Sequence, residues 1–215
     1  MDFGAVWDYR IVLAMGFVVT LELSAMAIVC STIFGFMTGL VLTSKSKGLK
    51  APFKVYVEIF RGSPLLIQLF MIFFGLPYLG IEISLFQTTI LVFTLYGGAY
   101  IAEIFRSGIE SVPKGQFEAA ASMGLTYAQT MKTIILPQAM KVSLPPLMGF
   151  HIGLIKDTSI ASVIGYMEVV KEGKAIINIT SKPFDVYIVI SLLFFAICYP
   201  LSLFVTAMEK RTRSS

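Results

Sequence analysis

Five long apolar segments constrain this chain more than any other feature. Each is long enough to cross the hydrocarbon core of a bilayer, which takes about 20 apolar residues in a helix. Only 14% of the residues are charged, whereas soluble domains average about 25%. Because a bilayer offers no water to backbone groups, such spans must be helical. The sequence therefore predicts an all-α membrane protein with five transmembrane helices, near residues 15–42, 55–78, 86–108, 138–164 and 184–208.

The distribution of Lys and Arg predicts the orientation of these spans. Basic residues follow the first span, surround residues 111–139 and close the chain, whereas the stretch 75–84 between spans two and three has none. Cytoplasmic loops carry the excess of basic residues, so the N-terminus is predicted outside and the C-terminus inside. Three lysines in the loop 166–183 oppose this assignment. We expect one membrane domain at 15–210, an N-terminal interfacial segment at 1–14 without a removable signal peptide, and a cytoplasmic tail at 211–215.

Residues 111–139 form the one sizeable polar interval with a helical pattern. Pro113 suits the first turn of a helix, and Gly124 can adopt the left-handed conformation that ends it. Thr126 and Gln129 have the spacing of a capping box, which opens a second helix, and Pro137 is expected to interrupt that helix. An apolar stripe runs along the second helix through Tyr127, Met131, Ile134 and Ile135. The pattern predicts a cytoplasmic helical hairpin between spans three and four.

Ionisable side chains inside membrane spans are costly and usually functional. Glu58 with Arg61, and Glu103 with Arg106, are three residues apart and can pair on a helix face; salt bridges at the cytoplasmic boundary are an equally good interpretation. Glu103 shares its face with Tyr96, Ala99 and Tyr100, where small residues would leave room for a ligand. The charged residues predicted within spans are Glu22, Glu58, Arg61, Glu103, Lys156 and Asp157.

The stretch Lys156–Ser159 lies deep in the fourth span, after the breaks expected at Leu144-Pro145-Pro146 and at two glycines. Interrupted helices at membrane depth are tolerated beside a cavity or inside protein. A lysine next to an aspartate, followed by the hydroxyls of Thr158 and Ser159, offers groups for both charges of a zwitterion. The alternative is a polar kink that only shapes the helix.

Several of these motifs resemble one known family. Glu118-Ala119-Ala120, Gly124 and Ile134-x-Leu136-Pro137 have the spacing of the EAA loop of ABC importer permeases. The stretches 60–66 and 155–165 resemble signatures of its polar amino acid branch, and 20–24 and 99–106 are similar to its first and third helices. The resemblance covers about 17–208.

The resemblance implies a function, partners and site residues. The hairpin would dock on a separate cytosolic ABC ATPase, which holds ATP and Mg and forms a dimer. A second permease copy, identical or a sister chain, and an extracytoplasmic amino acid-binding protein would complete a multi-pass assembly in the bacterial cytoplasmic (inner) membrane. ATPase coupling is expected from Glu118, Ala119, Ala120, Gly124, Leu136 and Pro137. A substrate pathway is expected along Glu22, Glu58, Arg61, Tyr100, Glu103, Lys156, Asp157, Thr158 and Ser159.

Catalytic and cofactor motifs are absent from the sequence. There is no G-x-x-x-x-G-K-[ST] phosphate loop and no H-E-x-x-H or G-x-S-x-G motif. Cys30 and Cys198 lie in separate spans, and a lone His151 does not make a metal site. Topology explains the basic residues better than nucleic-acid binding does. We therefore expect a non-catalytic subunit that binds no cofactor or metal itself.

The most favoured function is the transmembrane subunit of an ATP-driven importer that moves a polar amino acid by alternating access. Within the spans, Glu22, Glu103 and Asp157 outnumber Lys156, which favours a basic substrate slightly. An ion-gradient-driven secondary transporter or channel is one alternative, but it predicts an internal repeat that is not visible. A membrane scaffold without transport is another, and it leaves the charges within the spans unexplained.

Overall fold

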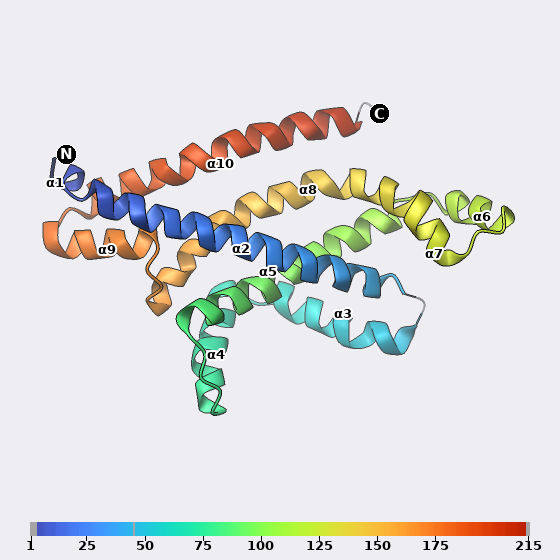
Figure 1. The fold of residues 1–215 in the computed structure, drawn as a ribbon, viewed down its shortest axis with the longest axis horizontal. Coiled ribbons are helices and arrows are strands. Elements are labelled where there is room, and N and C mark those ends of the chain that lie inside the picture. Colours follow the sequence, from blue (N-terminus) through green and yellow to red (C-terminus); the bar gives the residue numbers. More distant parts are fainter. Residues whose placement is uncertain (1–3, 45, 214–215) are drawn as a thin grey trace.

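The computed structural model describes residues 4–44 and 46–213, and within them every regular element is a helix. Four long helical runs lie side by side along the long axis of the molecule (Figure 1). Each is long and apolar enough to cross a membrane, and a bent pair of helices makes a fifth span if the two are counted together. The runs are α2 (Arg10–Leu42), α5 (Leu85–Glu110), Tyr127–Ile164 and α10 (Pro183–Arg213). The predicted all-α membrane fold is confirmed.

The predicted second span, 55–78, is not one straight helix. It comprises the end of α3 (Lys47–Gly62) and α4 (Leu65–Tyr78), and the chain bends by 112° between them. Ser63, between them, is extended at φ −124° and ψ 148°, because a residue that precedes proline is driven out of the helical region. The Gln68 side-chain amide donates to the Phe60 carbonyl at 2.7 Å and to the Ser63 carbonyl at 3.0 Å. These bonds hold the corner that Pro64 creates.

The chain ends lie at opposite ends of the bundle. A short helix α1 (Gly4–Trp7) precedes α2, which begins at Arg10 rather than near residue 15 as predicted. The predicted tail 211–215 begins inside α10, and residues 1–3 and 214–215 lie outside the described part. In Figure 1 the N-terminus and α9 (Val169–Thr180) lie at one end, and α6 and α7 lie at the other, which the C-terminal end of α10 approaches. This arrangement agrees with the predicted N-out, C-in topology.

The fourth span is a continuous helical run that changes type along its length. The run comprises α7 (Tyr127–Thr130), the π-helix η1 (Met131–Ile135), α8 (Leu136–Asp157) and the 3-10 helix η2 (Thr158–Ile164). Neither the expected interruption at Pro137 nor that at Pro145-Pro146 occurs. A proline cannot donate to the preceding turn and clashes with it. The wider π turn just before Pro137 is one way to accommodate it, and neighbouring helices stabilise prolines within spans.

Glycines on α2 allow it to pack closely on α5. A Cβ built on Gly35 would lie 2.6 Å from Ile101 Cβ and 2.9 Å from the Gly98 carbonyl oxygen. On Gly39 it would lie 3.0 Å from the Ala102 carbonyl oxygen. Small residues let helix backbones approach in membranes, and Gly35 and Gly39 have that role here. This contact positions α5 and the polar groups at its cytoplasmic end.

Candidate functional site

The hairpin at the cytoplasmic end has the local structure that its sequence predicts. Helix α6 (Lys114–Ser122) leads into a turn in which Gly124 has a φ of 74°. Thr126 Oγ1 then accepts from the Gln129 N–H at 3.4 Å, and Gln129 Oε1 accepts from the Thr126 N–H at 2.9 Å. The predicted glycine turn and capping box are confirmed. Pro113 precedes the helix as its N-cap residue instead of lying in the first turn.

The exposed surface of this hairpin differs in part from the residues expected to contact a partner. Glu118, Ala119 and Gly124 are exposed, but Ala120 is fully buried and packs within its own chain. Leu136 and Pro137 lie in α8, outside the tip of the hairpin. The tip exposes two large apolar side chains, Met123 at 67% and Tyr127 at 52%. Sequence periodicity had placed Tyr127 on a packed stripe, because it cannot show which side of a helix has a neighbour.

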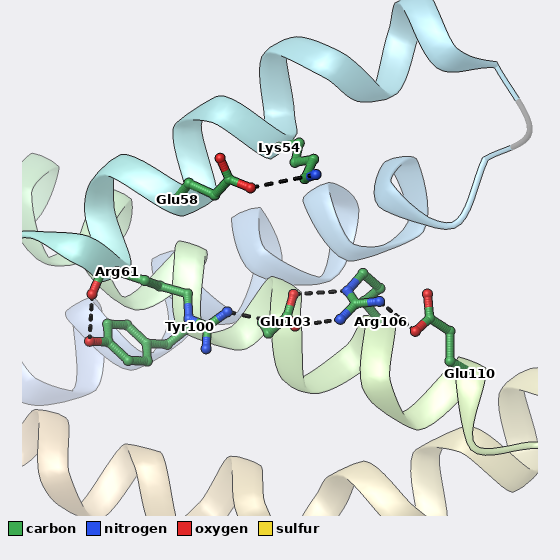
Figure 2. A network of polar contacts seen from close by, with 7 residues as sticks. All are labelled: Lys54, Glu58, Arg61, Tyr100, Glu103, Arg106 and Glu110. Atoms are coloured by element: carbon green, nitrogen blue, oxygen red, sulfur yellow. Dashed lines mark hydrogen bonds and ion pairs between the residues drawn. The ribbon is translucent and has the colours of Figure 1, made fainter.

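An ionic network crosses from α3 to α5 at the cytoplasmic half of the bundle (Figure 2). Arg106 Nε donates to Glu103 Oε2 at 2.9 Å, and Arg106 also pairs with Glu110. Arg61 Nη1 lies 3.6 Å from Glu103 Oε1. The predicted Glu103–Arg106 pair is confirmed. The other predicted pair is not formed, because Glu58 bonds to Lys54 at 3.6 Å while Arg61 turns toward α5.

An aromatic group continues this network toward the middle of the bundle. The Tyr100 hydroxyl donates to the Arg61 carbonyl oxygen at 3.4 Å, and the Arg61 guanidinium lies 5.6 Å from the centre of the Tyr100 ring. The Tyr100 ring stacks on the Phe150 ring of α8, with 5.2 Å between the ring centres. Its centre lies 4.9 Å from that of the Tyr96 ring. Tyr96 in turn interacts electrostatically with Asp157. Phe150 carried no signal in the sequence, because only the packing of α8 on α5 brings it here.

The four residues Lys156–Ser159 do not converge on one point. Lys156 and Ser159 line a cavity of about 610 Å³ between α8 and α10, together with Cys198 and Tyr199. Asp157 interacts electrostatically with Tyr96 of α5 and with Lys156, and it is not among the residues that line this cavity. Thr158 is buried, bonded to Ser24 of α2 at 3.3 Å and to the Ile155 carbonyl oxygen at 2.7 Å. The expected pairing of lysine and aspartate around one zwitterion is therefore not preformed in this chain.

The structure also shows the surroundings of two further polar residues, Glu22 and His151. Glu22 is exposed on α2 and interacts electrostatically with Tyr166. Glu22 and Gly39 are about 25 Å apart along α2. Gly39 packs against Ala102 of α5, which directly precedes Glu103. Glu22 is therefore remote from Glu103. His151 Nε2 lies 3.0 Å from Thr32 Oγ1, so its ring has a polar partner on α2. Within residues 4–44 and 46–213 no cluster of three metal-ligating side chains occurs.

A buried carboxylate at the opposite, N-terminal end was missed by the sequence analysis. Glu168 is fully buried and caps α9 by accepting from the Lys171 N–H at 2.9 Å. The Val169 N–H donates to Thr20 Oγ1 at 3.1 Å, which ties the start of α9 to α2. Burial raises the pKa of Glu168 to about 7, although bonds from backbone N–H groups and Thr20 lower it in part. The sequence predicted a loop at 166–183, so neither α9 nor the burial of its N-cap residue was expected.

The sequence is similar to those of known membrane transport proteins. Residues 31–214 match the family described as "Binding-protein-dependent transport system inner membrane component". The chain is 41% identical over 192 residues to the "Probable amino-acid ABC transporter permease protein YckA" of Bacillus subtilis (strain 168), with 89% of this chain and 85% of the relative covered. It is 38% identical over 204 residues to the "L-cystine transport system permease protein TcyB" of the same organism, with 93% and 86% covered.

Solved structures share the fold. The structure described as "Crystal structure of an amino acid ABC transporter with histidines" superposes with a TM-score of 0.91 at 34% identity, covering 98% of this chain and 99% of that chain. An inward-facing structure of the MetNI methionine ABC transporter superposes with a TM-score of 0.74 over 94% of this chain and 98% of that one. At 21% identity, that second likeness establishes the fold alone.

Proposed function

The chain belongs to the family of binding-protein-dependent transport system inner membrane components, and from that premise we propose which of its surfaces performs each step of import. It is the multi-pass membrane subunit of an ATP-driven amino acid importer. Its relatives are permeases of amino acid ABC transporters, and its fold is that of such a transporter. The steps below concern coupling, transmission and substrate contact.

Coupling is assigned to the exposed face of α6 and the turn that follows it. Glu118, Ala119 and Gly124 present a charge and little bulk, and Met123 and Tyr127 add exposed apolar surface. A small apolar centre beside a charge is typical of a protein interface, and the carboxylate can accept charge-assisted bonds. The partner is a dimeric cytosolic ABC ATPase, which carries ATP and Mg. A second permease chain and an extracytoplasmic binding protein complete the importer.

The observation that carries this proposal is the unbroken helical run from the hairpin into the membrane. Tyr127 and Asp157 belong to a single run, Tyr127–Ile164. A movement of the hairpin is therefore passed along α7, η1 and α8 to Asp157 as a rigid-body displacement. The π turn at η1 is the irregular point in that run, and such turns are frequent at functional sites.

Substrate contact is assigned to the aromatic side chains on α5 and α8 and to the carboxylate of Asp157. Tyr96, Tyr100 and Phe150 form an apolar and hydroxyl-bearing surface, and Asp157 supplies a negative charge for an ammonium group. Glu103 is neutralised by Arg61 and Arg106, so it no longer favours a basic substrate over other polar amino acids. Lys156 faces the cavity beside α10, where its ammonium group can bind a carboxylate.

The test is transport and ATPase activity of the assembled complex in proteoliposomes. With the binding protein present, one or a few polar amino acids should stimulate ATP hydrolysis and accumulate inside, and an uncoupler should leave uptake unchanged. Asp157→Asn should raise the KM for the amino acid at least tenfold while assembly stays normal, and Glu209→Gln, an exposed charge at the end of α10, should behave like wild type. Unchanged transport by Asp157→Asn would refute the substrate assignment. Uptake abolished by the uncoupler would refute direct ATP coupling.

A further inference from the structure

Two cavities meet at Lys50, near the cytoplasmic end of the bundle. The first, of about 670 Å³, lies between the hairpin and the cytoplasmic ends of α2 and α5, and its lining includes Thr43, Ile109 and Phe117. The second, of about 400 Å³, lies between α3 and α5 and is lined by Lys54, Arg61 and Arg106 among others. Lys50 lines both. Its side chain is therefore the group that a ligand in either cavity would meet.

The acidic groups in these cavities are already paired with other cations. Glu58 bonds to Lys54, and Glu103 and Glu110 both bond to Arg106. Among the described residues, no carboxylate and no other acceptor lies at bonding distance from Lys50 Nζ, although Lys50 is half-buried. A partly buried cation without an anion is unfavourable. The cavities thus hold a positive charge that the chain does not neutralise.

The remaining walls indicate what kind of anion fits. The larger cavity adds a second cation, Lys114, to apolar side chains that include Val112, Phe117 and Met131. A small inorganic anion would leave those apolar walls uncovered, whereas an amphiphile would satisfy both kinds of surface. Cations set beside apolar surface near the cytoplasmic boundary are typical of sites for anionic lipid headgroups.

The outer face of α3 indicates the source of that amphiphile. Leu49, Val55 and Ile59 are 51%, 55% and 58% exposed on the helix that carries Lys50. Exposed aliphatic side chains beside lysines are typical of a helix at the boundary between hydrocarbon and headgroups. Lipid is therefore the neighbour that the bilayer supplies at the outer face of α3.

We propose that Lys50 and Lys114 bind the phosphate of an anionic phospholipid from the cytoplasmic leaflet, with its apolar part against Val112, Phe117 and Met131. The site depends on the cytoplasmic orientation of the hairpin and on no particular transported amino acid. Because the larger cavity separates α6 from the ends of α2 and α5, the bound lipid would support the hairpin against the membrane domain. Coupling would then depend on anionic lipid.

The experiment compares Lys50→Gln with Lys47→Gln in the purified permease–ATPase complex. Lys47 is an exposed lysine on the same helix that lines neither cavity, so its loss controls for the general attraction of a basic helix to an anionic surface. Native mass spectrometry measures phosphatidylglycerol retained by the complex. Amino acid-stimulated ATPase activity is measured in phosphatidylcholine vesicles with increasing fractions of phosphatidylglycerol.

We expect retained phosphatidylglycerol in wild type and in Lys47→Gln, and its loss in Lys50→Gln. Lys50→Gln should need about fivefold more phosphatidylglycerol for half-maximal stimulation, the effect of one basic contact near the membrane surface, and Lys50→Arg should restore the wild-type requirement. Inorganic phosphate added to phosphatidylcholine vesicles should not replace the lipid.

Equal effects of the Lys47 and Lys50 variants would overturn the site, and so would replacement by free phosphate. Loss of ATPase assembly in Lys50→Gln, with lipid retention unchanged, would assign the cavity to the ATPase instead. The mass spectrometry does not depend on transport, so failure of the proposed function would be recognised separately.

Discussion

Replacing Gly35 by alanine tests the close packing of α2 on α5. The added Cβ would lie 2.6 Å from Ile101 Cβ and 2.9 Å from the Gly98 carbonyl oxygen. Carbon atoms pack best about 3.5–4.0 Å apart, so α2 and α5 must separate locally by about 1 Å. Both close atoms belong to the rigid part of α5, and neither is the end of a flexible side chain.

The expected cost follows from two opposing terms. Overpacking of this kind costs about 1–3 kcal/mol, and separating the helices also weakens the surrounding dispersion contacts by about a quarter to a half. The better helix propensity of alanine returns about 1 kcal/mol. The weakened dispersion contacts offset part of that return, so we expect a net loss of about 1–2 kcal/mol in the free energy of unfolding. For a chain of this size each kcal/mol lowers the Tm by about 2–4 °C.

The assay is thermal unfolding of the purified complex in detergent, with Gly149→Ala as the matched control. Gly149 lies inside α8, and a Cβ built on it meets no atom within 4 Å, so its Tm should stay unchanged or rise slightly. A Gly35→Ala protein with a Tm equal to or above that of wild type would contradict the close approach of α2 and α5. A fall of the same size in both variants would point to the loss of glycine flexibility as the cause.

Two further predictions concern the two ends of the bundle. The pKa of Glu168 is raised from 4.5 to about 7 by burial. Between these two pH values the folded state holds a proton that the unfolded state has lost. The free energy of unfolding should therefore fall as the pH rises from about 4.5 to about 7, by up to about 3 kcal/mol. Glu168→Gln keeps an acceptor for the Lys171 N–H but cannot ionise, so its Tm should lack this slope, and an identical pH profile in both proteins would contradict the buried carboxylate. At the other end, Glu118→Arg should abolish ATPase stimulation without lowering the Tm, because Glu118 is exposed. Gln116→Arg, an exposed change on the same helix, serves as its control, and equal activity of the two variants would remove Glu118 from the coupling surface.

Local chemistry made much of this fold predictable. The glycine turn at Gly124 and the capping box of Thr126 with Gln129 depend on residues within a few positions of one another, and both occur. The pair Glu103–Arg106 lies on a single helix, where spacing alone brings the groups together, and it is present too. Apolar length predicted the membrane spans for the same reason, because crossing a bilayer is a property of each segment by itself.

Contacts between segments were beyond that reasoning. The sequence paired Arg61 with Glu58 by spacing, but the 112° corner after α3 and the packing of α3 on α5 bring Arg61 to Glu103. Ala120 and Ala119 are equivalent in the motif, yet one is buried and the other exposed. Proline chemistry suggested breaks at Pro137 and Pro145, whereas the helical run continues through both.

The sequence by itself determined that the chain spans a membrane, how it is oriented, where its cytoplasmic hairpin lies and which family it resembles, because these follow from segment hydropathy, charge distribution and short-range motifs. Only the tertiary structure decided which charges face one another, that Lys156 and Asp157 turn to different neighbours, that Phe150 stacks on Tyr100, and that Glu168 is buried against α2. Those outcomes depend on how separate helices rotate and cross, and the sequence of one helix does not specify the face that its neighbour will cover.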